Sequence, residues 1–310
     1  MKALIIGAAG FVGGHLIAHL QSEGWEVAAT KMPHETCEAP HKVYDLDILD
    51  AEAIQRLVNA WQPTAIFHLA AQSSVALSWK EPALTVDVNV KGAVNLLEAV
   101  RKASVPPRVL LIGSGEEYGA AKDMPINEDQ PLHPGNVYAA TKAAQGMLGQ
   151  IYANAYGLDI LVVRAFTHTG PGQSDQFVLS NFCKQVAMIQ SGQTPPEMKV
   201  GNLEARRDFC DVRDVVRAYR LLIERGQRGV VYNVGSGRAL SIQDALDTIL
   251  TLSETDVTVV QDPARMRPSD TPVIEADITR LSAHTGWQPE IPLKNTLADM
   301  LEWWASKGRE

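Results

Sequence analysis

The sequence predicts an α/β protein with a doubly wound parallel sheet and a smaller second lobe. Residues 2–6 form an apolar run long enough for one buried strand, and apolar residues at helical spacing follow over 11–20. Between them stand three glycines spaced G-x-x-G-x-x-G. Further apolar runs alternate with helical patterns, which is typical of parallel strands joined by crossover helices. At 310 residues the chain exceeds the usual size of one core, so we expect two lobes.

The glycine-rich turn predicts a dinucleotide-binding site. Gly7 allows the tight turn, Gly10 lets a pyrophosphate approach the backbone, and Gly13 lets the helix pack close to the strand. The helix that starts at Phe11 and Val12 offers free N–H groups and a positive dipole end to the phosphates. A purely structural glycine turn is the alternative, but dinucleotide binding requires the strand-to-helix context found here.

Composition argues against several classes of function. The net charge of −8 and the pI of about 5.5 argue against a broad nucleic-acid footprint. Cys37, Cys183 and Cys210 are far apart and form no C-x-x-C, so we expect neither a disulfide framework nor a metal site. No apolar run reaches transmembrane length, and cleavage of a signal peptide would remove the glycine turn. We therefore expect a cytoplasmic enzyme with no nucleic-acid or membrane partner.

The end of the second strand bears on the choice of cofactor. This strand is expected over 26–30, and NAD-binding folds usually carry an acid at its end for the ribose 2′-hydroxyl. Here Thr30, Lys31 and Met32 stand at that end, with no acid before Glu35. Because a lysine would accept a 2′-phosphate, we expect NADP(H) at Lys31. The alternatives are NAD(H) and a Lys31 that is merely solvated.

The remaining elements of the first half complete the predicted sheet. Small residues after the fourth strand, Leu69 to Ala71, would let a cofactor lie against the backbone. His68, just before them, is interpreted as a packed core histidine rather than a ligand. The expected elements are strands at 43–44, 65–69 and 108–112 and helices at 50–61 and 82–103.

A tyrosine and a lysine on the next expected helix, 136–156, form a candidate catalytic pair. The i, i+4 spacing places Tyr138 and Lys142 on one helical face. A free tyrosine has a pKa of about 10, and a nearby ammonium would lower that pKa. Y-x-x-x-K alone is mostly structural. When it follows a glycine turn and lies downstream of Ser114, at the end of the fifth strand, the pattern becomes a specific indication of a catalytic pair.

A composition change after a sixth strand at 158–164 predicts the domain boundary, because residues 166–173 are rich in turn formers. We expect a nucleotide-binding domain over 1–166 and 211–237 and a substrate-binding domain over 167–210 and 238–310. Ser241 is expected to cap the helix that follows it. The other expected elements are helices at 177–191, 215–225, 242–252 and 293–305 and a seventh strand at 230–234.

Taken together, these motifs resemble those of extended short-chain dehydrogenases/reductases that act on nucleotide sugars. The resemblance covers essentially the whole chain and implies a Rossmann fold. Within that family, residues 114–119, 168–173, 200–203, 207–209 and 267–270 are most similar to GDP-4-keto-6-deoxy-mannose reductases, which make GDP-rhamnose. The sister GDP-mannose 4,6-dehydratases are usually longer and carry an arginine-rich cofactor loop that is absent here.

The resemblance implies roles for individual residues. Tyr138 would donate a proton, Lys142 would orient it and bind the nicotinamide ribose, and Ser114 would hydrogen-bond the sugar O4, with Glu116 beside them. The expected cofactor-binding residues are Gly7, Gly10, Phe11, Val12, Gly13, Lys31, Asp47, Ile48, Leu69, Ala70, Ala71, Asn89, Tyr138 and Lys142. The expected substrate-binding residues are Gln72, Ser73, Thr167, His168, Val178, Asn202, Arg207 and Arg267.

Some of these residues leave alternatives open. Glu116 matches the glutamate that removes the C5 proton in dehydratases, although reductases can also carry an acid there. Thr167 stands where relatives generally have asparagine. Arg207 and Arg267 would bind the diphosphate, because guanidinium forks suit phosphate. For Arg207 the alternative is a salt bridge with Asp208 or Asp211.

The reaction expected from this resemblance is hydride transfer from NADPH to C4 of a 4-keto-6-deoxy sugar on GDP. The alternatives are a GDP-mannose 4,6-dehydratase or another nucleotide-sugar epimerase or dehydratase, and, more distantly, a non-catalytic NADP(H) sensor. We also expect a homodimer through helices 82–103 and 136–156, where Ala139, Ala143 and Gly146 would allow close packing.

Overall fold

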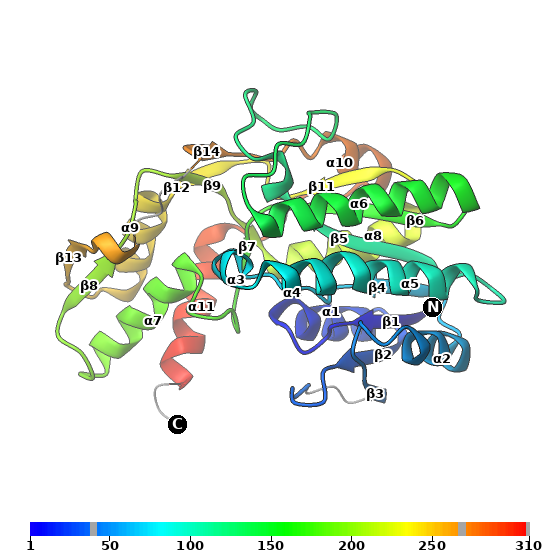
Figure 1. Cartoon of the computed structure of the whole chain (residues 1–310). Coiled ribbons are helices and arrows are strands. Elements are labelled where there is room, and N and C mark those ends of the chain that lie inside the picture. The colour runs from blue at the N-terminus through cyan, green and yellow to red at the C-terminus, as the bar shows by residue number, and fades with distance from the viewer. Residues whose placement is uncertain (38–41, 266–270, 308–310) are drawn as a thin grey trace.

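The computed structural model describes residues 1–37, 42–265 and 271–307. Seven parallel strands form its main sheet, in the order β11-β6-β5-β4-β1-β2-β3 (Figure 1). The strands are β1 (Lys2–Ile6), β2 (Glu26–Lys31), β3 (Lys42–Asp45), β4 (Ala65–His68), β5 (Arg108–Ser114), β6 (Ile160–Ala165) and β11 (Val231–Val234). The strand order reverses between β1 and β4, which is where doubly wound folds bind ligands. The predicted fold class is confirmed.

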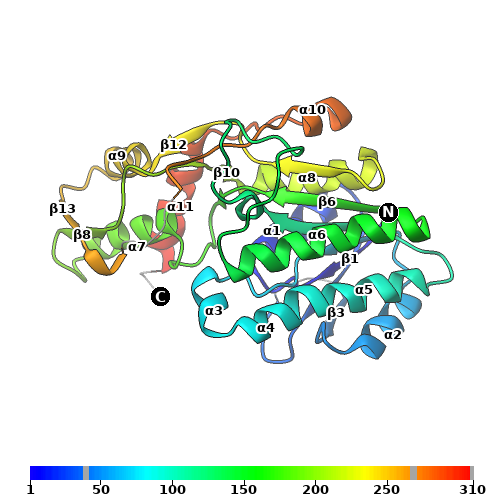
Figure 2. The ribbon, with the colours of Figure 1, turned by 45° about the horizontal axis from the view of Figure 1, so that its top comes forward.

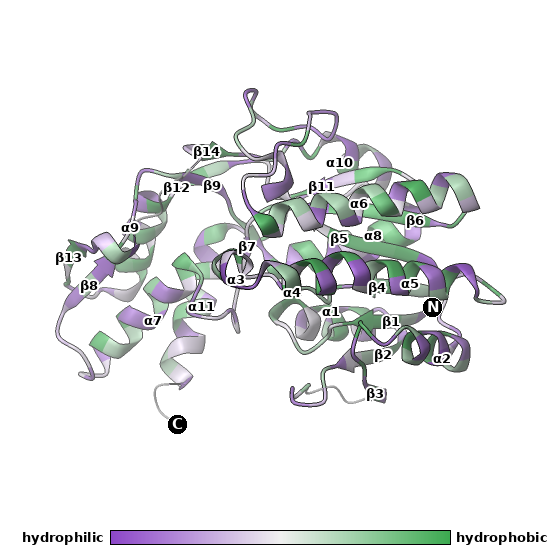
Figure 3. Cartoon of the chain, viewed as in Figure 1, coloured by the Kyte–Doolittle hydropathy of each residue, from purple (hydrophilic) through white to green (hydrophobic). Residues whose placement is uncertain are grey.

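Helices cover both faces of this sheet (Figure 2). One face carries α1 (Phe11–Ser22), α8 (Val212–Arg225) and α10 (Thr279–Thr285), and the other carries α2 (Ala51–Trp61), α5 (Gly92–Arg101) and α6 (Val137–Tyr156). Successive residues of a strand point to opposite faces. On β1, Ala3 and Ile5 therefore join the first core, and Leu4 and Ile6 join the second. Apolar residues dominate β1 and β5 in Figure 3.

The helix expected over 82–103 changes its winding partway along. It begins as α4 (Pro82–Val86), passes through a π-helical turn, Asp87–Lys91, and continues as α5. The prediction of a uniform helix was wrong, because the apolar spacing that predicts a helix does not reveal one wide turn. Such turns are often found at functional sites, and this one carries the predicted cofactor residue Asn89. A six-residue helix that was not predicted, α3 (Val75–Lys80), precedes it.

Three helices gather around a separate apolar cluster at the other end of the molecule (Figures 1 and 2). They are α7 (Val178–Gln190), α9 (Ile242–Ser253) and α11 (Leu293–Lys307). Ser241 caps α9 as predicted, because its hydroxyl accepts the Asp244 N–H at 3.0 Å. The domain boundaries stay a prediction, since Leu281 and Trp287 of the C-terminal part belong to the core of the main sheet.

Short strands that were not predicted complete the fold. A three-stranded sheet joins β12 (Ala239–Ser241), β9 (Arg206–Asp208) and β14 (Val273–Ile274), and two pairs join β10 (Cys210–Asp211) to β7 (His168–Thr169) and β13 (Thr258–Gln261) to β8 (Glu197–Val200). Two 3₁₀ turns span Gly115–Tyr118 and Pro263–Arg265. Helix α8 begins three residues earlier than expected, because the Asp211 side chain accepts the Arg213 N–H and caps it.

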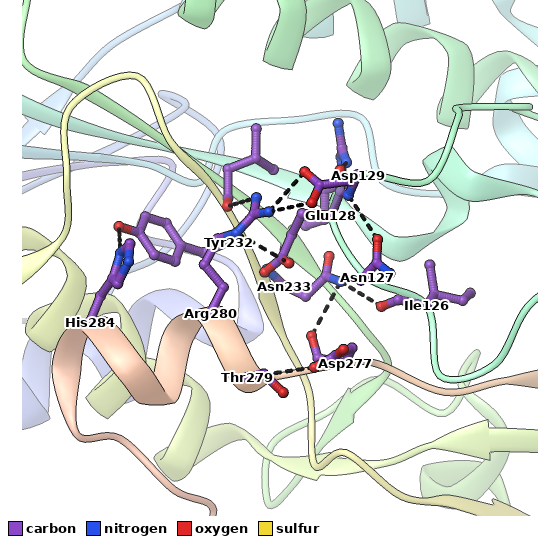
Figure 4. Close-up of polar contacts among 12 residues, drawn as sticks. Ile126, Asn127, Glu128, Asp129, Tyr232, Asn233, Asp277, Thr279, Arg280 and His284 are labelled. Carbon is purple, nitrogen blue, oxygen red and sulfur yellow. Dashed lines mark hydrogen bonds and ion pairs between the residues drawn. The ribbon is translucent and has the colours of Figure 1, made fainter.

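The free edge of β11 is closed by side chains (Figure 4). Glu128 Oε1 accepts the Asn233 N–H at 2.9 Å, and Arg280 Nη1 donates to the Val231 carbonyl at 3.3 Å. The same guanidinium holds both carboxylate oxygens of Asp129, at 2.8 and 2.9 Å. Polar groups of the outer strand are thus satisfied without a neighbouring strand.

Candidate active site

The turns that follow β1 and β4 lie in direct contact. Gly7 has a φ of +84°, and a Cβ there would stand 2.5 Å from the backbone nitrogen of Ala70. The Ala70 N–H donates to the carbonyl of Ile6 at 2.8 Å. Only glycine allows both this conformation and this approach. The predicted cofactor residues 69–71 consequently lie beside the glycine turn.

Helix α1 starts as a phosphate-binding helix should. A Cβ at Gly13 would stand 2.1 Å from the carbonyl oxygen of Ala8, so α1 packs tightly onto the turn. Its N-cap is Gly10, and no side chain caps the first turn, which begins with Phe11 and Val12. Backbone N–H groups at an uncapped helix start favour an anion. The residues present therefore fit the pyrophosphate of a dinucleotide.

Thr30, at the end of β2, anchors the glycine turn and was not identified from sequence. Its Oγ1 accepts the Gly7 N–H at 3.1 Å, and its carbonyl accepts the Ala8 N–H at 2.8 Å. The next residue, Lys31, forms an ion pair with Asp45 of β3 at 2.5 Å. The sequence did not indicate this pair, because it depends on β3 lying next to β2 in the sheet.

Two further predicted cofactor residues follow β3. Asp47 is exposed, and its Oδ1 accepts the Leu49 N–H at 2.9 Å. Ile48 is buried against α5, where a Cβ at Gly92 would stand 2.8 Å from its Cγ2. Contact between either residue and a cofactor stays a prediction.

The predicted catalytic residues meet at the end of β5. Ser114 is the last residue of that strand, and its hydroxyl hydrogen-bonds the phenol of Tyr138 on α6. Asn136 caps α6 by accepting the Ala139 N–H at 2.8 Å, which places Tyr138 in the first turn. Lys142, one turn on, donates to the Ile112 carbonyl of β5 at 2.7 Å.

Burial governs the protonation of this pair. It raises the pKa of Tyr138 to about 12, although the hydrogen bond from Ser114 lowers it in part. Burial also lowers the pKa of Lys142 to about 8, against the opposite effect of Glu117. The expectation that Lys142 lowers the pKa of Tyr138 was therefore wrong, because desolvation dominates and the ammonium binds the Ile112 carbonyl. The Tyr138 phenol therefore carries its proton at neutral pH.

Glu116 lies beside the catalytic residues. Its N–H donates to the Ser114 hydroxyl at 3.2 Å, so the serine proton points away from it, toward the Tyr138 phenol. Its carboxylate accepts the side-chain amide of Asn136 at 3.3 Å. Glu116 is partly exposed, so it can face a substrate.

Asn89 and Gln72 join the turn after β4 to the catalytic helix. Asn89 is fully buried, its Oδ1 accepts the Gln72 N–H at 2.8 Å, and its Nδ2 donates to Thr141 at 2.9 Å. Thr141 lies between the two predicted catalytic residues of α6. The Gln72 amide donates to Thr85 at 2.8 Å. Within the protein both side chains are bonded, and their ligand contacts, like those of the exposed Ser73, stay predictions.

The loop over 167–171 lies against the first turns of α1. The rings of His168 and Phe11 are stacked, with centroids 6.2 Å apart, and His15 Nε2 is 2.9 Å from the Pro171 carbonyl. Thr167 is exposed, and Val178 is the first residue of α7. His168, one of the residues expected to bind the sugar nucleotide, thus lies next to the glycine turn.

The other predicted substrate residues lie further along the chain. Arg207 Nη1 donates to the Thr271 carbonyl at 2.7 Å, and Asn202 Oδ1 accepts the Glu204 N–H at 3.0 Å. Of the two acids proposed as partners of Arg207, Asp211 pairs with Arg213 at 2.7 Å. The other, Asp208, is buried and accepts hydrogen bonds from two segments, through Ser236 and Gly237 of one and Ala276 of the other. Arg267 lies outside the described residues.

Comparison with known proteins places this site in a family. A family profile described as GDP-mannose 4,6 dehydratase matches residues 4–300. The chain belongs to that family. It is 36% identical to GDP-6-deoxy-D-mannose reductase of Pseudomonas aeruginosa, over 100% of this chain and 99% of that one, and 29% identical to GDP-mannose 4,6 dehydratase 2 of Arabidopsis thaliana, over 97% and 86%. The predicted resemblance is confirmed.

Solved structures of relatives share the whole fold. RMD from Pseudomonas aeruginosa complexed with NADPH superposes with a TM-score of 0.89 at 34% identity, covering 99% of this chain and 100% of that one. UDP-glucose 4-epimerase of Thermotoga maritima with UDP-glucose gives a TM-score of 0.91 at 29% identity, with both chains fully covered. The family members are NAD(P)-dependent enzymes of the extended short-chain dehydrogenase/reductase type.

No helix among residues 1–37, 42–265 and 271–307 is both long and apolar enough to cross a membrane. Within the same ranges, no group of three or more His, Cys, Asp and Glu side chains is placed to hold a metal ion.

Two neighbouring glycines of α1 provide a matched test of the phosphate site. We expect Gly13→Ala to abolish measurable NADPH binding and to destabilise the protein, because its Cβ would overlap the Ala8 carbonyl. Gly14→Ala has no atom within 4 Å of its new Cβ and should keep both properties, with a gain of up to about 1 kcal/mol in helix propensity. Fluorescence titration with NADPH and urea unfolding measure the two effects. Equal binding by both variants would remove the glycine turn from the site.

Proposed function

We propose that this protein is an NADPH-dependent reductase that converts the C4 ketone of GDP-4-keto-6-deoxy-D-mannose to the alcohol of GDP-D-rhamnose. The observation that carries the proposal is the full-length similarity to a GDP-6-deoxy-D-mannose reductase, at 36% identity. The protonation of the site supports it, because the raised pKa of Tyr138 keeps a proton ready for the developing alkoxide. We further propose that the enzyme acts in the cytoplasm, in keeping with its three free cysteines.

In this proposal the chain provides binding, orientation and a proton. Bound NADPH would supply the hydride to C4. Tyr138 donates its phenolic proton to the C4 oxygen, and Ser114 stabilises that oxygen through its hydroxyl. Ser114 is well placed for this because Glu116 N–H already occupies one of its lone pairs. Lys142 is held between the Ile112 carbonyl and Gln145 Oε1, where its ammonium would meet the cofactor ribose.

The nucleotide and sugar would lie in the smaller domain that we propose over 167–210 and 238–310. Thr167, His168 and Val178 would contact the sugar, and Asn202 would lie by the guanine. Arg207 and Arg267 would bind the diphosphate. The position of His168 against Phe11 supports this arrangement, because it joins the proposed sugar site to the start of the phosphate-binding helix.

A dehydratase is the second candidate, and Glu116 favours it. This carboxylate lies beside Ser114 and is partly exposed, so it could remove a C5 proton. Redox balance separates the two reactions. A dehydratase returns to C6 the hydride that it takes from C4, so its NADP⁺ is regenerated, whereas a reductase consumes one NADPH for each sugar.

We expect GDP-4-keto-6-deoxy-mannose to oxidise NADPH one for one, and GDP-mannose with catalytic NADP⁺ to give no product. Loss of NADPH absorbance and chromatography of the nucleotide sugars measure these outcomes. Tyr138→Phe is the matched control and should reduce turnover about 100- to 10,000-fold while leaving NADPH binding intact. A 4-keto product from GDP-mannose alone would favour the dehydratase. A wild type that binds NADPH but turns over neither sugar would favour the non-catalytic sensor.

Lys31 tests the proposed preference for NADP(H) over NAD(H). We propose that it turns from Asp45 to a bound 2′-phosphate, so Lys31→Glu should weaken NADPH binding relative to NADH about 10-fold or more. Lys42→Glu, the same charge change at the far end of the neighbouring strand β3, should leave the ratio unchanged. Dissociation constants of both nucleotides for both variants measure it. An unchanged ratio in Lys31→Glu would assign the preference elsewhere.

We propose that the protein is a homodimer. Leu84 and Val86 of α4 and Met147 and Ile151 of α6 are apolar yet 43–56% exposed, and the two helices pack side by side (Figure 2). The expectation that Ala139, Ala143 and Gly146 line this interface was wrong, because all three are buried.

Replacement of one apolar residue of this face should dissociate the dimer. Light scattering should give about twice the chain mass of 33.7 kDa for the wild type and the single-chain mass for Ile151→Glu. Val105→Glu, in an exposed loop before β5, should remain dimeric. A wild-type protein that is monomeric at all concentrations contradicts the proposal.

A further inference from the structure

Glu117, the neighbour of the candidate base Glu116, is fully buried behind the catalytic residues. Its Oε1 accepts the Ser114 N–H at 2.7 Å, and its Oε2 is 3.0 Å from Nε of Arg164. A buried carboxylate is costly unless it is paired and hydrogen-bonded, and this one is both. It therefore fixes the backbone of the residue that would hold the substrate oxygen.

Gly113 makes room for this carboxylate, and Gly146 lies close to it. A Cβ at Gly113 would stand 2.3 Å from Glu117 Oε1, and one at Gly146 would stand 3.9 Å from Oε2. Gly146 follows Lys142 by one helical turn, so the carboxylate faces the same side of α6 as that lysine. The carboxylate thus lies between β5 and α6.

The groups that face Lys142 come from four elements. Tyr138 lies on α6, as Lys142 itself does, and Glu117 lies on the 3₁₀ turn. His68 lies on β4, and Arg164 lies on β6, behind Glu117. His68 is neutral, because burial lowers its pKa to about 3. Burial lowers the pKa of Lys142 to about 8, and the carboxylate of Glu117 acts to raise it.

The same carboxylate acts on Tyr138. Its charge disfavours a phenolate and so adds to the raised pKa of that side chain, together with the charge of Glu116. One buried negative charge therefore favours the proton-bearing form of both members of the pair. A reduction requires these forms, because the phenol must give a proton to the C4 oxygen.

We propose that Glu117 is a positioning residue that keeps the Tyr138–Lys142 pair protonated and so prepares the site to deliver a proton rather than to remove one. This inference rests on the proposed reduction. In that step the phenolic O–H bond breaks as the O–H bond at the sugar C4 oxygen forms. The Lys142 ammonium balances the charge of the phenolate until water returns the proton.

Arg164 favours the charged form of Glu117. Burial raises the pKa of Glu117, and the guanidinium and the Ser114 N–H oppose that rise. Arg164 Nη1 also donates to the Tyr118 hydroxyl at 2.9 Å and to the Glu128 carbonyl at 3.2 Å, next to the cluster of Figure 4. These two hydrogen bonds hold its position at the edge of the sheet, where it also lines a surface cavity of about 420 Å³.

Glu117→Gln removes the charge but keeps an oxygen that can accept the Ser114 N–H. We expect the alkaline limb of the kcat/KM profile for NADPH-dependent reduction to move about one pH unit or more to lower pH, since a nearby opposite charge shifts a pKa by that amount. Loss of the negative charge lowers the pKa of both Lys142 and Tyr138, so either group moves the limb in the same direction.

A second measurement needs neither cofactor nor activity. In protein labelled with [ε-¹³C]lysine, the Lys142 resonance is identified by its absence from Lys142→Arg, and its titration should have a midpoint near pH 8. Glu117→Gln should lower that midpoint by about one pH unit or more. If the wild type lacks reductase activity, the proposed function fails, while this titration still tests Glu117.

The double variant Glu117→Gln, Arg164→Gln separates positioning from structural support. The single variant leaves a buried guanidinium without its partner and should lose stability, and the double variant should recover part of it. A purely structural role predicts that the wild-type pH profile and Lys142 midpoint return with that stability. Our inference predicts that both shifts persist, because the carboxylate is still absent. If Glu117→Gln does not fold, the double variant carries the test, and an unshifted midpoint in it overturns the inference.

Discussion

The contact between Gly7 and Ala70 is the constraint on which the rest of the site depends. It brings the ends of β1 and β4 together at the point where the strand order reverses. Parallel strands open a crevice there, and its floor must be backbone, because side chains would fill the space that a cofactor needs. Thr30 of β2 holds the turn from a third strand, because its hydroxyl accepts the Gly7 N–H. The neighbouring strands β4, β1 and β2 thus hold the predicted phosphate-binding turn in one position.

The predicted catalytic residues depend on a second junction, between β5 and α6. Lys142 ties the helix to the Ile112 carbonyl, and Asn89 ties it to the turn after β4. The wide π turn lets Asn89 reach Thr141 and Gln72 together. The turn after β4 is therefore shared by the glycine turn and by the helix that carries Tyr138, and it links the two.

Local patterns were enough to predict the sheet, the glycine turn and the positions of Ser114, Tyr138 and Lys142. Each depends on spacing within one segment. The features that were missed depend on contacts between segments distant in sequence. The pairing of Lys31 with Asp45 requires knowledge of which strand lies next to β2, and the protonation of Tyr138 requires knowledge of its burial. The ion pair between Glu117 and Arg164 likewise joins residues 47 positions apart in the sequence.

The packing of Trp287 has a consequence for how the chain folds. This side chain is fully buried in the core of the main sheet, and its indole N–H donates to the Asp214 carbonyl of α8 at 3.0 Å. Asp214 in turn accepts the N–H groups of Glu290 and Ile291 at 2.9 and 2.8 Å. A fragment ending at residue 237 would lack the indole that fills this part of the core. It would also remove the N–H donors of Glu290 and Ile291 from the buried Asp214 carboxylate, which would keep only the guanidinium of Arg217 among these partners. The main sheet therefore reaches its complete core only after these C-terminal residues have been made.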